Sequence, residues 1–146
     1  MKTGTSSAAV ILILALGSAA LAAEDSPAPA SAGPVTTVVG RASTTITGQP
    51  LAAPQGDWEV VFSTSELPAG GALPMHKHPW PRYAYVERGR LSVRYEAAGL
   101  EREFGPGEAV VEALDQWHEG RVVGDEPVRL IVIDQLPRGQ SNVVRR

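Results

Sequence analysis

The sequence predicts an all-β protein built as a single antiparallel β-barrel. Short stretches of alternating apolar and polar residues follow one another from residue 57 to residue 136. Turn signals separate these stretches, and Gly105-Pro106-Gly107 is the sharpest of them. No stretch after residue 34 has the period of an amphipathic helix. Short strands at regular spacing with turns between them are typical of β-sandwiches and barrels.

The first 34 residues are expected to lie outside the barrel. An apolar run over residues 8–16 follows Lys2, and Ala20-Leu21-Ala22 has the small residues that precede a signal-peptidase site. We therefore expect residues 1–22 to be a signal peptide and the protein to be exported, periplasmic or secreted. The alternative is an uncleaved membrane anchor, but the apolar run is short for a full span. Residues 23–34 are rich in Pro, Ala and Ser and are expected to form a disordered linker.

Composition excludes several other classes of protein. The 146-residue chain has a formal net charge of −3 and no block of basic residues, so nucleic acid is not an expected partner. It has no cysteine, which excludes disulfides, thiolate ligands and a lipoprotein anchor. After signal cleavage we expect no stable membrane anchor.

The barrel is expected to span residues 35–136, with a polar C-terminal tail over 137–146. The first long strand is predicted at 57–67, where Trp58, Val60 and Phe62 alternate with Glu59 and Val61 to give a half-buried strand. Pro74 prevents a helix in the extended stretch at 72–78. The other predicted strands lie at 35–39, 83–87, 91–95, 100–104, 109–112, 117–123 and 128–136.

All three histidines of the chain fit one site. His76 and His78 are separated by one residue, so on an extended strand both side chains point to the same face. His118 follows forty residues after His78 and can approach from another strand. Imidazole is a common ligand for zinc, iron and nickel, so this pattern predicts a divalent metal site, with Fe, Zn, Mn or Ni as the candidate metals.

The stretch from Gly70 to Gly89, with His76-Lys77-His78 inside it, resembles the first motif of the cupin superfamily. Gly107 with His118 eleven residues later resembles the second motif. The resemblance covers about residues 58–136 and implies a cupin barrel, that is, a jelly roll or double-stranded β-helix. It also implies a homodimer, which small cupins commonly form through edge strands.

Two departures from the motifs bear on the chemistry. Metal-binding cupins use three histidines and a glutamate, and the glutamate position of the first motif is Arg82 in this sequence. The Pro and Gly of the second motif are replaced by Ala113 and Asp115.

The roles of Glu112 and Arg82 remain open from the sequence. Glu112 lies six residues before His118 and can replace the missing ligand or hydrogen-bond a ligand histidine. The sequence favours the alternatives to ligation, an ion pair with Arg82 or an exposed position. Arg82 either points into the barrel, where it can clamp an anion, or is turned outward by a one-residue shift at Pro79 and Pro81.

Trp80 and Trp117 flank the histidine motifs and are candidates for an apolar substrate pocket, with packing in the core or at a dimer interface as the alternative. Three functions fit these observations. The first is an exported small cupin that binds a divalent metal through three histidines and acts on or binds a small molecule. The second is a mononuclear non-haem iron dioxygenase with a three-His site. The third is a non-enzymatic barrel that binds a small ligand such as a carbohydrate.

Overall fold

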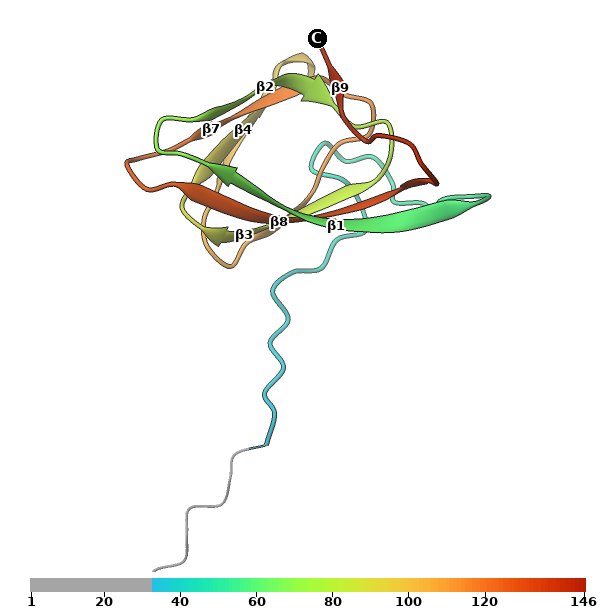
Figure 1. Cartoon of the computed structure of the whole chain (residues 1–146), viewed down its shortest axis with the longest axis horizontal. Helices are drawn as coiled ribbons and strands as arrows, with labels where there is room; N and C mark the ends of the chain where they lie inside the picture. The colour runs from blue at the N-terminus through green and yellow to red at the C-terminus, as the bar shows by residue number, and fades with distance from the viewer. Residues whose placement is uncertain (1–32) are drawn as a thin grey trace, which may run out of the picture. The chain divides into compact units, whose positions relative to one another are not determined.

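The computed structural model describes residues 33–146, whose regular structure is β-strand apart from one short 3-10 turn at Glu96–Ala98. Two antiparallel sheets face each other (Figure 1). One sheet has the strand order β1-β8-β3-β6 and the other β5-β4-β7-β2-β9. The strands are β1 (Trp58–Leu67), β2 (Ala72–Lys77), β3 (Arg82–Arg88), β4 (Leu91–Tyr95), β5 (Leu100–Phe104), β6 (Ala109–Val111), β7 (His118–Val122), β8 (Val128–Pro137) and β9 (Val144–Arg145). The predicted all-β jelly roll is confirmed.

Two of the sequence expectations concern the beginning of the chain. The predicted signal peptide and all of the predicted linker except Gly33 and Pro34 lie outside the described residues. The strand predicted at 35–39 is wrong, because this segment has no regular structure and Val35 is 87% exposed. Within residues 33–146 there is no helix of the length and apolarity that a membrane span requires.

The buried core lies between the two sheets and comes mainly from alternate positions of three strands. The inward positions of β8 are Val128, Leu130 and Val132, and those of β4 are Leu91, Val93 and Tyr95. Ala84 and Val86 of β3 complete one wall. This alternation is the period-2 pattern of a strand with one buried face.

Strand β1 was predicted correctly, but its apolar set is not its buried face. The register with β8 places Phe62 opposite Ile133, an outward position, so Phe62 is 72% exposed and Val60 is 37% exposed. Leu67 is the buried residue of this strand. Because the side-chain period is 2, the strand presents one set outward and the other, which includes Ser65 and Leu67, inward.

The C-terminal segment predicted as a polar tail instead extends the second sheet. β9 pairs with the edge of β2, with Arg145 opposite His76 and Val144 opposite Lys77. Asn142, just before β9, is only 4% exposed. β9 has only two residues, and the buried residue before it is a polar asparagine. The segment therefore has no alternating apolar pattern, and for this reason the last predicted strand ended at Leu136.

One residue of each motif, Gly89 and Asp115, has a positive φ angle. Gly89 has φ of 75°, and a Cβ there would lie 2.5 Å from the carbonyl oxygen of Pro127, so only glycine fits. Asp115 is the only non-glycine residue with positive φ in the described chain, at 54°. It occupies the position where the second motif has glycine. Its carboxylate lies 2.6 Å from Nζ of Lys77, and its N–H donates to the carbonyl of His78.

Candidate metal centre

The structure brings the three histidines together on the inner face of one sheet. β2 pairs with β7 so that His76 lies directly opposite His118. His78 follows β2 by one residue and its ring lies 4.8 Å from that of His76 and 5.0 Å from that of His118. All three are buried, with 7%, 1% and 2% of their surfaces exposed. The convergence follows from i and i+2 positions on one strand and a cross-strand neighbour on the next.

Each imidazole is oriented by a backbone carbonyl. Nδ1 of His76 lies 2.7 Å from the oxygen of Pro74, and Nδ1 of His118 lies 3.0 Å from that of Gln116. Nδ1 of His78 lies 2.6 Å from the oxygen of Asn142. A carbonyl only accepts, so Nδ1 carries the proton in each neutral ring. Nε2 of each ring is therefore left with its lone pair, the form in which histidine binds metal.

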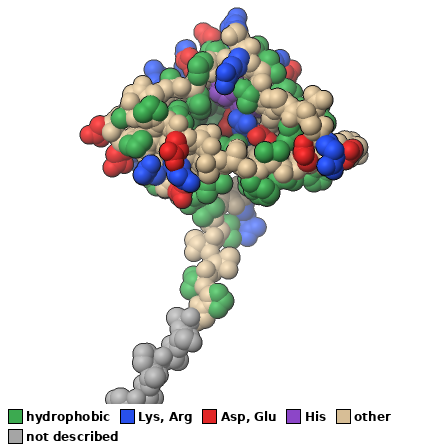
Figure 2. Space-filling model, viewed as in Figure 1, with side chains coloured by type: hydrophobic (Ala, Val, Ile, Leu, Met, Phe, Trp, Pro, Cys, Tyr) green, Lys and Arg blue, Asp and Glu red, His purple; other side chains and the backbone are tan. Residues whose placement is uncertain are grey.

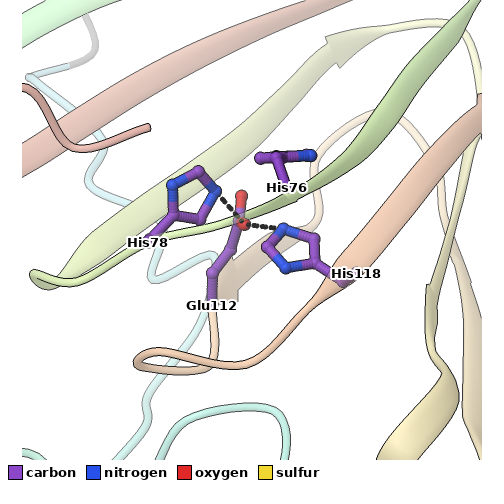
Figure 3. A group of neighbouring side chains, drawn as sticks. All are labelled: His76, His78, Glu112 and His118. Carbon is purple, nitrogen blue, oxygen red and sulfur yellow. Dashed lines mark ion pairs between the residues drawn. The ribbon is translucent and has the colours of Figure 1, made fainter. Parts of the chain in front are cut away.

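Glu112 completes the group (Figure 3). It follows β6 by one residue, and its N–H donates to the carbonyl of Arg82 on β3. Its Oε2 lies 3.0 Å from Nε2 of His78 and 2.9 Å from Nε2 of His118. The interpretation of Glu112 as an exposed residue or as the ion-pair partner of Arg82 is wrong. Because β6 ends at Val111, the next residue, Glu112, points between the sheets toward the histidines.

The four side chains have the donor set of a divalent metal site. One ligand atom from each lies within 4.8 Å of the others. Nε2 of His78 and of His118 is enclosed and makes no hydrogen bond within the described chain. A cation bound between these atoms would accept the lone pairs of both nitrogens and of the carboxylate oxygen, in place of the protons that these groups can share. Three imidazole nitrogens and one carboxylate oxygen therefore fit a divalent first-row metal.

The surroundings of His76 and Glu112 favour the protonation states that metal binding requires. Burial lowers the pKa of His76 to about 4, with a further contribution from His118. Burial of Glu112 favours its neutral form, but the adjacent His118 and His78 outweigh this effect and hold the pKa of Glu112 well below its usual range. Near neutral pH, His76 is thus uncharged and Glu112 is ionised, as metal ligation requires.

A cavity of about 230 Å³ lies against this group between the sheets. Figure 2 shows the molecular surface hollowed at this point, with histidine in the hollow and charged side chains beside it. The apolar part of the lining comes from Leu73, Leu91, Val93, Leu130, Val132 and Val143. Polar groups of the lining include Ser65, His76, His118, Glu112, Arg82 and Arg145. A small apolar pocket with convergent polar groups is typical of a ligand site.

Arg82 points inward, which is one of its two predicted orientations, but its guanidinium is paired with Asp134. Nε and Nη2 donate to the two oxygens of Asp134 at 2.7 and 2.8 Å. Asp134 also accepts from Nδ2 of Asn142 at 2.6 Å. Arg82 therefore serves as part of a buried network, and its positive charge is balanced by Asp134.

The two tryptophans lie apart from the cavity lining. Trp80 borders a separate hollow with Trp58, Pro79 and Pro81. Trp117 lies beneath two cations, with Nζ of Lys77 at 5.2 Å and the guanidinium of Arg146 at 5.9 Å from its ring centre. Neither side chain is among the residues that line the cavity beside the histidines.

Three residues near the site were not identified from the sequence as site residues. Asn142 and Asp134 belong to the network that holds Arg82 and His78. Tyr95 stacks on His118 with ring centres 4.6 Å apart, and its hydroxyl accepts from the N–H of Ala113. Burial raises the pKa of Tyr95, so it stays neutral. The inward alternation of β4 was the one available signal, and it marks Tyr95 only as a core residue.

Comparison with known proteins agrees with this architecture. A family model described as the cupin domain matches residues 63–134. The solved structures that resemble the chain include the polyketide cyclase RemF from Streptomyces resistomycificus, at 28% identity and a TM-score of 0.50, covering 62% of this chain and 61% of that one. The DMSP lyase DddQ from Ruegeria pomeroyi DSS-3 has 23% identity and a TM-score of 0.52, covering 67% and 46%.

A recombinant oxalate oxidase in complex with glycolate has 22% identity and a TM-score of 0.50, covering 59% of this chain and 45% of that one. This chain thus spans less than two thirds of each of these three structures. At such identities the lyase and the oxidase show the fold. The comparison with curated proteins gave no match. From its two motifs, its paired sheets and the match over residues 63–134, the chain belongs to the cupin superfamily.

Proposed function

We propose that the protein is a metal-binding cupin that takes up one divalent ion on His76, His78, His118 and Glu112 and acts on or binds a small molecule in the adjoining cavity. The observation that carries the proposal is the convergence of one carboxylate and three imidazole rings, each with its Nδ1 on a backbone carbonyl, in a buried place. Bound there, the ion would act as a Lewis acid toward a ligand oxygen, or as a redox centre if it is iron or manganese.

The residues around the ion have separate tasks. The carbonyl groups of Pro74, Gln116 and Asn142 hold the three rings in the tautomer that ligates. The apolar walls exclude water from the ligand and strengthen the electrostatic interactions inside. The cavity volume of about 230 Å³ lies below the ~300–1,000 Å³ of pockets for drug-sized ligands. A small molecule is therefore the expected ligand.

Glu112 bears on one of the two alternative functions, the iron dioxygenase, and leaves the ligand-binding barrel open to a separate test. The similarity to an iron dioxygenase depended on a site of three histidines without a carboxylate, and Glu112 at 2.9 Å from His118 removes that basis. Oxygen uptake by iron-loaded protein, absent with zinc, would restore this candidate. A non-enzymatic ligand-binding barrel would bind its ligand tightly without any metal.

Elemental analysis of protein purified from its native compartment tests the proposal. We expect about one divalent ion per chain and a higher thermal midpoint with the ion than without it, because the ion binds only the folded state. Changing His76, His78, His118 or Glu112 singly to Ala should reduce both quantities. The control is Glu119→Ala, which removes a carboxylate next to His118 that pairs with Arg94 at the surface. No metal uptake by the wild type, with unchanged melting of the variants, would overturn the proposal.

We also propose that the mature chain is exported. The support is the apolar run at 8–16 followed by Ala20-Leu21-Ala22. Mass spectrometry of protein from the cell envelope or medium should find Ala23 or Glu24 at its start. Recovery of an intact Met1 from the envelope fraction would instead indicate a retained anchor.

A homodimer is proposed through the outer face of the sheet β1-β8-β3-β6. Strand register aligns Phe62, Ile133 and Tyr83 in one row across this face and Thr64, Ile131 and Tyr85 in the next. Phe62 is 72% and Ile131 37% exposed. The centre of these rows is uncharged, so two copies of the face can pack on each other about a two-fold axis, as an isologous interface requires.

A further inference from the structure

The C-terminal strand β9 places a cation beside the candidate metal centre. Arg145 is the direct cross-strand partner of His76 in the pairing of β9 with β2. Directly opposed residues of antiparallel strands point to the same face, with Cβ atoms about 4.5–5.5 Å apart. Since His76 points between the sheets, Arg145 also lies on the inner face, and it contributes to the lining of the cavity.

Arg145 differs from the other arginine of the cavity in having no acidic partner. Arg82 is neutralised by two hydrogen bonds to Asp134. Among residues 33–146, ion pairs of arginine with a carboxylate involve Arg82, Arg94, Arg102, Arg121, Arg129 and Arg138. Arg145 takes part in none of them; it is exposed and is one of the residues that line the cavity.

The charges around the cavity add to a positive total. Glu112 faces the histidines, so with a divalent ion bound the metal site keeps a formal charge of plus one. Arg145 adds a second positive charge at the mouth. In a cavity with apolar walls, such charges are weakly screened and favour an anionic ligand. The forked guanidinium of arginine suits a carboxylate in particular.

The strand that carries Arg145 is held in place. Asn142 donates from Nδ2 to Asp134, and its Oδ1 accepts from the N–H of Trp80 at 2.9 Å. Just after β9, the N–H of Arg146 donates to the carbonyl of Met75 at 3.3 Å. Arg145 is therefore presented to the cavity from a paired strand fixed at both ends, which limits the ordering cost of binding.

We propose that Arg145 binds the carboxylate of the ligand at the mouth of the cavity, and that the ligand is a small monocarboxylic acid with an apolar body. The inference rests on the proposed metal-binding function and adds the ligand class to it. The cavity of about 230 Å³ is smaller than the ~300–1,000 Å³ of pockets for drug-sized ligands. This size matches a short-chain acid whose carbon chain lies along Leu73, Leu130 and Val132.

Calorimetric titration of zinc-loaded protein with pentanoate and with its neutral analogue pentanamide tests the inference. We expect the wild type to bind pentanoate more tightly than pentanamide. Arg145→Gln should weaken pentanoate binding at least about tenfold, equivalent to 1.4 kcal/mol, and leave pentanamide binding unchanged. Arg145→Lys should recover part of the loss. The matched control is Arg146→Gln, since Arg146 lies over Trp117 instead of in the cavity lining.

Zinc content and thermal midpoint are measured for every variant, so that loss of folding or of metal is seen directly. Equal affinity of wild type for acid and amide, no pentanoate binding, or no effect of Arg145→Gln would each overturn the inference. If the wild type takes up no zinc, the proposed metal site fails, and the same titration is carried out on the metal-free protein. A pentanoate preference that still depends on Arg145 would then support the role of Arg145, and its absence would overturn it.

Discussion

Nδ1 of His78 donates a 2.6 Å hydrogen bond to the backbone carbonyl of Asn142, so the end of the chain orients a residue of its central motif. The side chain of Asn142 fixes that carbonyl. Its Oδ1 accepts from the N–H of Trp80 at 2.9 Å, and its Nδ2 donates to the carbonyl of Trp80 at 3.1 Å and to Asp134 at 2.6 Å. Asn142 thus couples the position of the last strand to the geometry of the metal ligands.

Replacing Asn142 with Ala should therefore affect both folding and metal binding. The change removes the hydrogen bonds of the Asn142 side chain to the N–H of Trp80 and to the buried Asp134, which costs about 1–3 kcal/mol of unfolding free energy. Without a fixed carbonyl, His78 loses its orientation, and metal affinity should fall about 10–100-fold. Chemical denaturation and competition with a metal chelator measure the two effects. Gln140→Ala, at an exposed position nearby, is the control. A variant that is destabilised but binds metal like the wild type would contradict the positioning role.

Asp115 provides a test of backbone strain at the loop before His118. Its φ of 54° is in the left-handed region, which costs a side chain with a Cβ roughly 1–2 kcal/mol. Asp115→Gly removes this strain and loses only a surface ion pair with Lys77, so stability should stay equal or rise by up to about 1 kcal/mol. Asp115→Val should lower it by about 1–2 kcal/mol or more. Urea denaturation of the three proteins gives the comparison. A glycine variant less stable than the valine variant would contradict this account.

These residues show why the sequence predicted part of the site and not the rest. The spacing of His76 and His78 fixes their shared face on any extended strand, and the motif distance placed His118 near them. Glu112 could not be assigned, because its direction depends on β6 ending at Val111. The partnership of Arg82 with Asp134 depends on the register of β3 with β8, which brings together residues 52 positions apart.

The fold was predictable to a similar extent and for similar reasons. In a strand with one buried face, burial repeats every second residue, and β3, β7 and β8 follow this pattern. β9 gives no such pattern, because it is short and both its residues are exposed. The face of β1 was missed because Phe62 and Val60 are apolar on the outside of the barrel. An exposed apolar face obeys the same alternation as a buried one.

The pKa of His76 predicts a pH dependence of stability in the metal-free protein. The pKa is about 4 in the folded chain and 6.5 in the unfolded chain, so between these values the unfolded state binds more protons. The unfolding free energy should therefore fall as pH is lowered from about 6.5 to about 4, on the order of 1–2 kcal/mol for a site that keeps some solvent contact.

Urea denaturation of chelator-treated protein at several pH values across this window measures the slope. His76→Gln removes the titrating group and should flatten that slope while leaving the loss below pH 4, which comes from carboxylates. Equal slopes for the variant and the wild type would show that His76 does not titrate as its buried position requires.

The exposed position of Phe62 leads to a prediction about assembly. Phe62 is 72% exposed and lies beside Ile133 and Tyr83 on the outer face of the sheet β1-β8-β3-β6. If two copies pack through this face, a charge at residue 62 is buried against its own copy across the two-fold axis, and like charges there oppose association. Phe62→Glu should convert a dimer into a monomer and leave the thermal midpoint of the monomer almost unchanged, because the side chain has few contacts within its own chain.

Val144→Glu is the matched control, since Val144 is an exposed apolar residue, at 38%, on the other sheet. Sedimentation velocity distinguishes the two states. A wild type that is monomeric at every concentration, or a Phe62→Glu variant that remains dimeric, would show that this apolar face is not the interface.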